Sequence, residues 1–338
     1  MAELVLPEKI YYGIGSLDRI FDRDYQSVLI ASDGDISQKS GALLEIERKF
    51  LSLMTKTHTA VSALPQELFE QCRKYVNTQL PDVIVGIGNA QTLDAVRAVS
   101  YFSGTPFIAV PECAPSALLE FDTLDVFLCR NMPSVCILDP DFINRRDSSG
   151  IAYEAFGTVC LCLESAVYAE DSYVSACAVQ ALESLFRNIL PSYRGEISAR
   201  ENLLKAMYAA FWCYENTFSY SWESPSYLLS SFFSRRDIPK LSVLASALPF
   251  LFGRFREHDE TKLFSACRAL TQTPDDAERI NTALHEIRKV QAILSVPSSV
   301  KNFSISEEEF ERDASALSER DRELYEKCFN SNTVFVKK

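Results

Sequence analysis

The sequence predicts an α/β protein in two parts: an N-terminal doubly wound, Rossmann-like parallel-sheet domain over residues 1–147, and an all-α domain over residues 148–338. In the first part, short apolar runs of strand length alternate with helical segments. After residue 147 these runs stop, and long amphipathic segments follow. A chain of 338 residues with 47% hydrophobic content is large enough for two such cores.

Each expected element rests on a local pattern. Near-continuous apolar runs that end in turn residues predict parallel strands buried on both faces, at residues 27–32, 82–88, 106–111 and 134–140. Apolar residues at i, i+3, i+4 and i+7 predict crossover helices at residues 40–54 and 65–79. The same spacing predicts long helices at residues 174–190, 197–215 and 275–294, and Ser306 with Glu309 predicts a capping box before an exposed acidic helix.

Composition narrows the functional classes. A net charge of -12 repels phosphate backbones and anionic lipid surfaces, so neither nucleic acid nor a membrane is an expected partner. No apolar run approaches the roughly 18 residues that span a bilayer, and the first residues do not resemble a signal peptide, so we expect a cytoplasmic protein. The ten cysteines lack CxxC spacing and predict reduced core thiols. The chain has only 11 glycines and three histidines (His58, His258 and His285). We therefore do not expect a glycine-rich phosphate loop or a metal site built from several histidines.

The stretch "DVIVGIGNAQTLDAVRAVS", residues 82–100, predicts a buried strand, a glycine turn and a helix, which is the arrangement that binds dinucleotide phosphates. Gly88, Asn89, Gln91 and Asp94 are the candidate cofactor-binding residues of this turn, together with Ser116 in "ECAPSALL" further along. A plain strand–turn–helix packing unit is the alternative interpretation. NAD(P) is therefore a possible but doubtful cofactor.

Four motifs in the same order resemble the iron-containing (group III) alcohol dehydrogenases of the dehydroquinate synthase-like superfamily. They are "KIYYGIGSLDRI", "DVIVGIGNAQTLDAVRAVS", "PFIAVPECAPSALLEF" and "VCILDPDF". The resemblance implies a Rossmann-like domain that binds NAD(P), followed by a helical domain that carries a metal and the substrate. That metal is held by one Asp and three His side chains.

The chain departs from this pattern at each functional part. Asn89, Ala90 and Gln91 stand where the resemblance expects Gly, Gly and Ser, and Glu112 and Pro115 fall in the second nucleotide loop. The cover hairpin near the substrate that the resemblance implies is largely deleted before "MPSVCILDP". Glu164 keeps the register of the metal motif, but the four ligand positions fall on Gly157, Leu161, Ser226 and Lys240. We therefore expect no metal.

Two functions remain open. The favoured one is a divergent protein of this kind that lacks the metal site and ordinary alcohol dehydrogenase activity: a pseudoenzyme kept for binding or assembly, as a homodimer or beside an active paralogue. The alternative is a metal-independent enzyme, an NAD(P)-dependent oxidoreductase or a lyase, with Lys240 in place of the metal. Ser226 would assist Lys240, with companions in Tyr227, Arg235 and Arg236, on a small anionic ligand. The favoured interpretation of Lys240 itself is that its side chain reaches solvent or pairs with an acid at a helix end.

Overall fold

The first half of the protein is built on a six-stranded parallel sheet with the strand order β1-β6-β5-β4-β2-β3. The structure is a computed structural model that describes residues 4, 6–34, 41–112, 131–218, 224–234, 240–271, 278–303, 305–315 and 317–330. Its N-terminal elements are β1 (Lys9–Tyr12), η1 (Ser16–Asp22), β2 (Ser27–Ser32), α2 (Ala42–Ser52), β3 (Lys56–Val61), α3 (Pro65–Gln79), β4 (Val83–Gly88), α4 (Ala90–Ser103), β5 (Phe107–Pro111), β6 (Val135–Leu138) and α6 (Pro140–Asn144).

This architecture confirms the expected fold class. The four predicted apolar runs form β2, β4, β5 and β6, and the two predicted crossover helices form α2 and α3. The sequence pattern missed β3, whose "KTHTAV" begins with four polar residues and buries only Ala60. β3 pairs only with β2 at the edge of the sheet, where one side of a strand is not covered, so a continuous apolar run is not needed.

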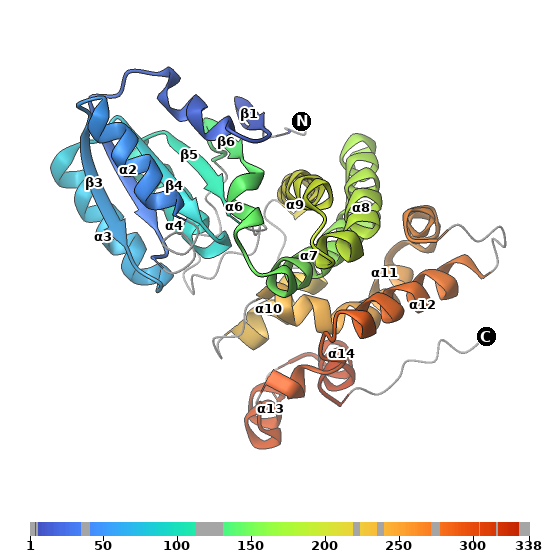
Figure 1. The fold of residues 1–338 in the computed structure, drawn as a ribbon. Coiled ribbons are helices and arrows are strands. Elements are labelled where there is room, and N and C mark those ends of the chain that lie inside the picture. Colours follow the sequence, from blue (N-terminus) through green and yellow to red (C-terminus); the bar gives the residue numbers. More distant parts are fainter. Residues whose placement is uncertain are drawn as a thin grey trace.

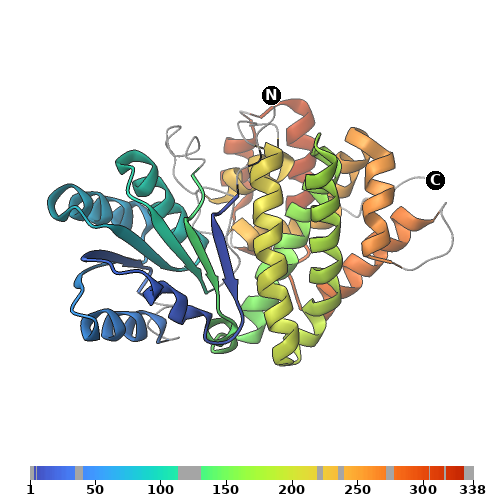
Figure 2. The same ribbon diagram turned by 90° about the horizontal axis from the view of Figure 1, so that it is seen from above.

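Two layers of helices cover the sheet, as seen end-on in Figure 2. On one face of the sheet, every second residue of β2, β4, β5 and β6 packs against η1, α2 and α6. The alternate residues of the same strands pack with α3 and α4 on the other face, and this apolar cluster continues without a break into the helical half. The alternation follows from the period of two residues in a strand.

The second half of the described chain is helical (Figure 1). Its elements are α7 (Ser148–Tyr168), α8 (Ser172–Tyr193), α9 (Ile197–Phe218), α10 (Pro225–Ser234), α11 (Lys240–Ala266), η2 (Cys267–Ala269), α12 (Arg279–Ile293), η3 (Val300–Phe303), α13 (Glu307–Ala314) and α14 (Glu319–Asn330). The predicted capping box is present before α13, because the main-chain N–H of Ser306 donates to Glu309 Oε2 and that of Glu309 donates to Ser306 Oγ.

Helix α7 is the centre of the helical half. It packs against α8, α9 and α11, and the Asp147 side chain caps its start by accepting from the Gly150 N–H at 2.9 Å. By length and composition α7 could cross a membrane, contrary to the expectation that no segment of the chain could. However, 83% of its apolar window is buried inside the protein, so α7 is the core helix of this half.

Candidate functional site

The carboxyl ends of the central strands β2, β4 and β5 carry the first candidate site. β3 lies on one side of β2 and β4 on the other, so the chain reverses its direction across the sheet between β2 and β4. In open α/β sheets ligands bind in the crevice at such a reversal. Asp33 follows β2, Gly88 and Asn89 close β4, and Glu112 follows β5. The predicted phosphate turn therefore lies at the expected place in the fold.

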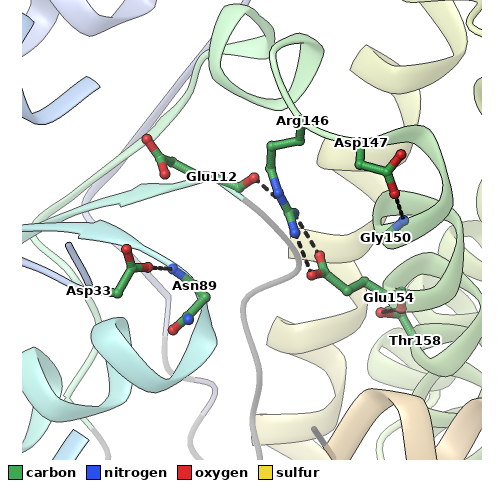
Figure 3. Close-up of polar contacts among 8 residues, drawn as sticks. All are labelled: Asp33, Asn89, Glu112, Arg146, Asp147, Gly150, Glu154 and Thr158. Atoms are coloured by element: carbon green, nitrogen blue, oxygen red, sulfur yellow. Dashed lines mark hydrogen bonds and ion pairs between the residues drawn. The ribbon is translucent and has the colours of Figure 1, made fainter. Parts of the chain in front are cut away.

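Two side chains, one from the turn itself and one from the end of β2, accept from main-chain donors of the turn after β4. Asn89 caps α4, because its Oδ1 accepts from the Thr92 N–H at 3.0 Å. The N–H of Asn89 donates to Asp33 Oδ2 at 3.2 Å, across the crevice between β4 and β2 (Figure 3). Gly88 has a φ of 144°, and a Cβ there would lie 2.5 Å from the same Asp33 oxygen. A phosphate at this turn would have to approach the Asp33 carboxylate, which carries the same sign of charge.

The remaining predicted cofactor residues are less closely grouped. Gln91 lies half-buried in the first turn of α4, on the same turn as Asn89. Asp94 is 3% exposed and lies 3.4 Å from Arg97, whose guanidinium lies 2.9 Å from Glu215 on α9. Asp94 is thus part of an ionic contact between the sheet half and the helical half. Ser116 and Pro115 lie outside the described residues, as does the segment of the predicted hairpin deletion.

Arg146 joins the end of β5 to α7 through a hydrogen bond and an ion pair that the sequence did not predict. The carbonyl of Glu112 accepts from Arg146 Nη1 at 3.1 Å, and both terminal nitrogens of Arg146 contact the Glu154 carboxylate at 2.9 and 2.7 Å. Figure 3 shows the Glu112 side chain pointing away from Arg146, toward the sheet. Glu112 is fully buried, so its carboxyl group lies inside the protein beside the carboxyl edge. Arg146 and Glu154 lie eight residues apart, and no local pattern predicts their pairing.

The positions expected to hold a metal lie where α7, α10 and α11 meet. Gly157 and Leu161 are both on α7, and α7 packs directly against the first turn of α11. A Cβ built on Gly157 would lie 2.9 Å from the carbonyl carbon of Leu241, 3.0 Å from its Cα and closer still to its carbonyl oxygen. Main-chain atoms therefore occupy the space that an Asp side chain at residue 157 would need.

Ser226 lies in a buried cluster of hydroxyl groups around Glu164. Its Oγ donates to Glu164 Oε2, and its N–H donates to Glu164 Oε1 at 3.2 Å. Ser224 Oγ donates to Glu164 Oε1 at 2.9 Å and lies 2.6 Å from the Tyr214 hydroxyl. Desolvation raises the pKa of Glu164 to about 7, although the hydrogen bonds from Ser226 and Ser224 act in the opposite direction. Glu164 and Ser226 thus satisfy each other.

Lys240 begins α11, as its place after "DIP" predicts, and is only 4% exposed. Its Nζ lies 6.0 Å from the centre of the Tyr227 ring, within the range of a cation–π contact. The interpretation of Lys240 as a solvent-exposed lysine is therefore wrong, whereas its pairing with an acid at a helix end stays a prediction. Arg235 and Arg236, its suggested companions, lie outside the described residues.

The donor set at these positions does not fit a catalytic iron or zinc ion. Gly157 and Leu161 have no donor atom, Ser226 is hydrogen-bonded to Glu164, and Lys240 carries an ammonium group. Within the described parts of the chain, no three His, Cys, Asp or Glu side chains are placed to hold a metal ion. The three histidines lie elsewhere: His58 is on β3, His258 stacks on Tyr168, and His285 is exposed on α12.

The architecture described above is the fold of the iron-containing alcohol dehydrogenases. No family model matches the chain. An alcohol dehydrogenase from Oenococcus oeni superposes with a TM-score of 0.84 at 14% identity, over 97% of this chain and all of that one. An iron-containing alcohol dehydrogenase from Thermotoga maritima superposes with a TM-score of 0.75 at 15% identity, over 98% of this chain and 100% of that one.

Among curated proteins, the chain is 20% identical to the NADPH-dependent butanol dehydrogenase of Clostridium saccharobutylicum. That alignment covers 98% of this chain and 94% of the relative. The resemblance read from the sequence motifs is confirmed as a distant likeness over the full length, at 14–20% identity. A likeness at such low identity shows a shared fold only. The chemistry of this chain has to be argued from its own residues.

Proposed function

We propose that this chain is a divergent protein with the iron-containing alcohol dehydrogenase fold that works without the metal and has no ordinary alcohol dehydrogenase activity. Its role is then binding or assembly. The contact between Gly157 and the Leu241 main chain is the observation that carries this proposal. A missing ligand can be replaced by a neighbouring side chain, but occupied space excludes any ligand from residue 157.

The state of the other ligand positions supports the same proposal. Ser226 is already bound to Glu164, and Leu161 is fully buried among apolar residues of the helical core. A divalent ion at this place would also meet the ammonium group of Lys240. These positions offer a metal ion no negative charge, no space and no free donor atom. We expect this combination where natural selection no longer maintains metal binding.

We also propose that NAD(P) binds weakly or not at all. Two main-chain donors at the start of α4, the N–H groups of Asn89 and Thr92, already donate to Asp33 and Asn89, and the Asp33 carboxylate lies at the same turn. A diphosphate would therefore have to displace an internal hydrogen bond and tolerate negative charge.

The experiment that tests the proposal is an activity assay with NADPH and butanal, in the presence of added iron(II), added zinc(II) or a chelator. The reaction is the reverse of the activity that the Clostridium saccharobutylicum relative's name gives. We expect no NADPH oxidation above the rate without protein under any of the three conditions. A rate that appears with iron(II) and disappears with the chelator would overturn the proposal.

A second candidate function is a metal-independent enzyme that uses Lys240. The observation in its favour is that Lys240 is nearly buried, at 4% exposure, on the helix that contacts α7 and α10. A buried ammonium can hold an anionic group or polarise a carbonyl. The test is Lys240→Met, which should abolish binding of a small anion such as inorganic phosphate or oxalate with little change in thermal stability. If neither anion binds the unaltered protein, this candidate fails.

A further inference from the structure

Arg200, on α9, is a nearly buried guanidinium whose polar partners are both neutral. The residue is 8% exposed. Its Nη1 donates to the carbonyl of Asn144 at 2.9 Å, and its Nη2 donates to Ser148 Oγ. Among the residues that the structure describes, its Nε has no hydrogen-bond partner and no carboxylate is paired with the guanidinium. Because a buried charge without a counter-charge costs free energy, an anion at this place would be stabilised.

Two other arginines that are buried to a similar extent each lie beside a carboxylate. Arg97 is 3% exposed and lies 2.9 Å from Glu215, and Arg254 is 9% exposed and lies 3.1 Å from Asp321. These two positive charges therefore have counter-charges inside the protein. Arg200 has only a carbonyl oxygen and a hydroxyl oxygen, so it can still receive the charge of an added anion.

Both partners of Arg200 lie at the junction of the two halves of the protein. Asn144 ends α6 and Ser148 begins α7, and α9 packs against both helices (Figure 1). The start of α7, a helix of 21 residues, carries the positive end of the helix dipole. An anionic group on the Ser148 oxygen would therefore be stabilised by the helix dipole and by Arg200 together.

The sequence before Ser148 is a second and independent feature that points to a phosphoryl group on this oxygen. In "RRDSSG", residues 145–150, Arg145 and Arg146 precede Ser148 by three and two positions. Arginine-directed serine kinases recognise such a charge pattern with acidic side chains. Arg145 is exposed, and Ser148 is half-buried. Arg146 is paired with Glu154, so its recognition requires local opening of the turn between α6 and α7.

We propose that Ser148 is a phosphorylation site and that Arg200 receives its phosphate. In the reaction Ser148 Oγ bonds to the γ-phosphorus of ATP and the bond from this phosphorus to the β–γ bridging oxygen breaks. ADP leaves, and the hydroxyl proton passes to the catalytic base of the kinase. The phosphoserine carries a charge of about -1.5 to -2 at pH 7. It supplies the counter-charge that Arg200 lacks and adds acceptors for the guanidinium nitrogens.

The phosphate would strengthen the contact of α9 with the junction between the sheet half and the helical half. Asp147, the nearest acid in the sequence, would repel it. However, Asp147 is exposed and accepts from the Gly150 N–H at 2.9 Å, so solvent screens its charge more than that of buried Arg200 (Figure 3). We therefore expect phosphorylation to stabilise the protein, whether or not it binds metal or NAD(P).

Incubation of the full-length protein with ATP and the catalytic subunit of cyclic-AMP-dependent protein kinase tests the site itself. Peptide mass spectrometry should find about one phosphate per chain on Ser148, and Arg145→Ala should slow its incorporation at least about tenfold. Absence of phosphate from Ser148, or its incorporation mainly on Ser149, would overturn the proposal.

Thermal unfolding of the phosphorylated protein tests the role of Arg200. We expect a Tm about 2–4 °C above that of the unmodified protein. In Arg200→Gln, which removes the positive charge, phosphorylation should no longer raise the Tm. An equal rise with and without Arg200, or no rise in the unaltered chain, would contradict the assignment of Arg200 as the receiver of the phosphate.

The pair Ser148→Asp and Ser149→Asp gives the same test while Arg200 stays in place. Both variants put a carboxylate into the first turn of α7, but only residue 148 contacts Arg200. Ser148→Asp should therefore raise the Tm at least about twice as much as Ser149→Asp. Equal shifts would assign the whole effect to the helix dipole and would overturn the proposal.

Discussion

At the carboxyl edge of the sheet, the main chain has a strand–turn–helix frame, and two of its N–H groups donate to Asp33 and Asn89. Between α7 and α11, by contrast, the main chain of Leu241 fills the space beside Gly157, where the resemblance places a metal ligand. A single substitution could free a donor in the first region. In the second region, two helices would have to move apart. The two regions thus differ in how large a structural change a ligand would need.

The largest expected effect comes from Gly157→Ala, which probes the filled region. The added methyl group meets main-chain atoms of Leu241, and we expect a loss of at least about 3 kcal/mol in the free energy of unfolding. Urea unfolding measures it.

Gly253→Ala is the matched control, because Gly253 is also in a helix and a Cβ there has no atom within 4 Å. It should stabilise the protein by about 0.5–1 kcal/mol. Equal effects of the two substitutions would mean that α7 and α11 are not in close contact at Gly157.

The next effect is the contribution of Glu164 to the pH dependence of the free energy of unfolding. The pKa of Glu164 is raised from 4.5 to about 7 in the folded protein. Its contribution to stability is therefore fully present below pH 4.5 and is lost as the pH rises through about 7, by at most about 3 kcal/mol. Glu164→Gln should remove this slope.

Unfolding curves between pH 4.5 and 8 check the expectation for Glu164. Glu183→Gln serves as control, because Glu183 lies on the surface of α8 in an ion pair with Arg187. An unchanged slope in Glu164→Gln would show that another group titrates in this range.

The smallest effect concerns the sheet edge. Asp33→Asn removes a negative charge and keeps an oxygen that accepts from the Asn89 N–H, so the affinity for NADPH should rise about fivefold, or about 1 kcal/mol. Asp82→Asn is the control, because Asp82 accepts from the N–H groups of Gln26 and Ser27 at the opposite end of the strands. Titration by NADPH fluorescence measures both variants. Low-micromolar saturation of the unaltered protein would contradict the proposed weakness of NAD(P) binding.

The sequence predicted the central strands because these are buried on both faces and must be apolar throughout. It missed β3, because an edge strand such as "KTHTAV" needs no such run. The residue types at the metal positions could also be read from the sequence once the register of Glu164 was set. Their side-chain environment could not, since the burial of Lys240 depends on how α11 packs against other helices.

Two features of the candidate site came only from the structure. Asp33 directly follows a predicted strand, so attention to polar residues after every strand end could have identified it. The filling of the metal position could not have been found in this way. It depends on the distance between α7 and α11, which is set by the packing of both helices and leaves no mark at Gly157 beyond the absence of a side chain.

The most direct test of the central claim is the metal content of the protein after anaerobic dialysis against iron(II) or zinc(II), followed by gel filtration and elemental analysis. The absence of a fitting donor set at Gly157, Leu161, Ser226 and Lys240 predicts well under one metal ion per chain. About one ion per chain, lost in Ser226→Ala, would contradict the account and show that α7, α10 and α11 still enclose a metal.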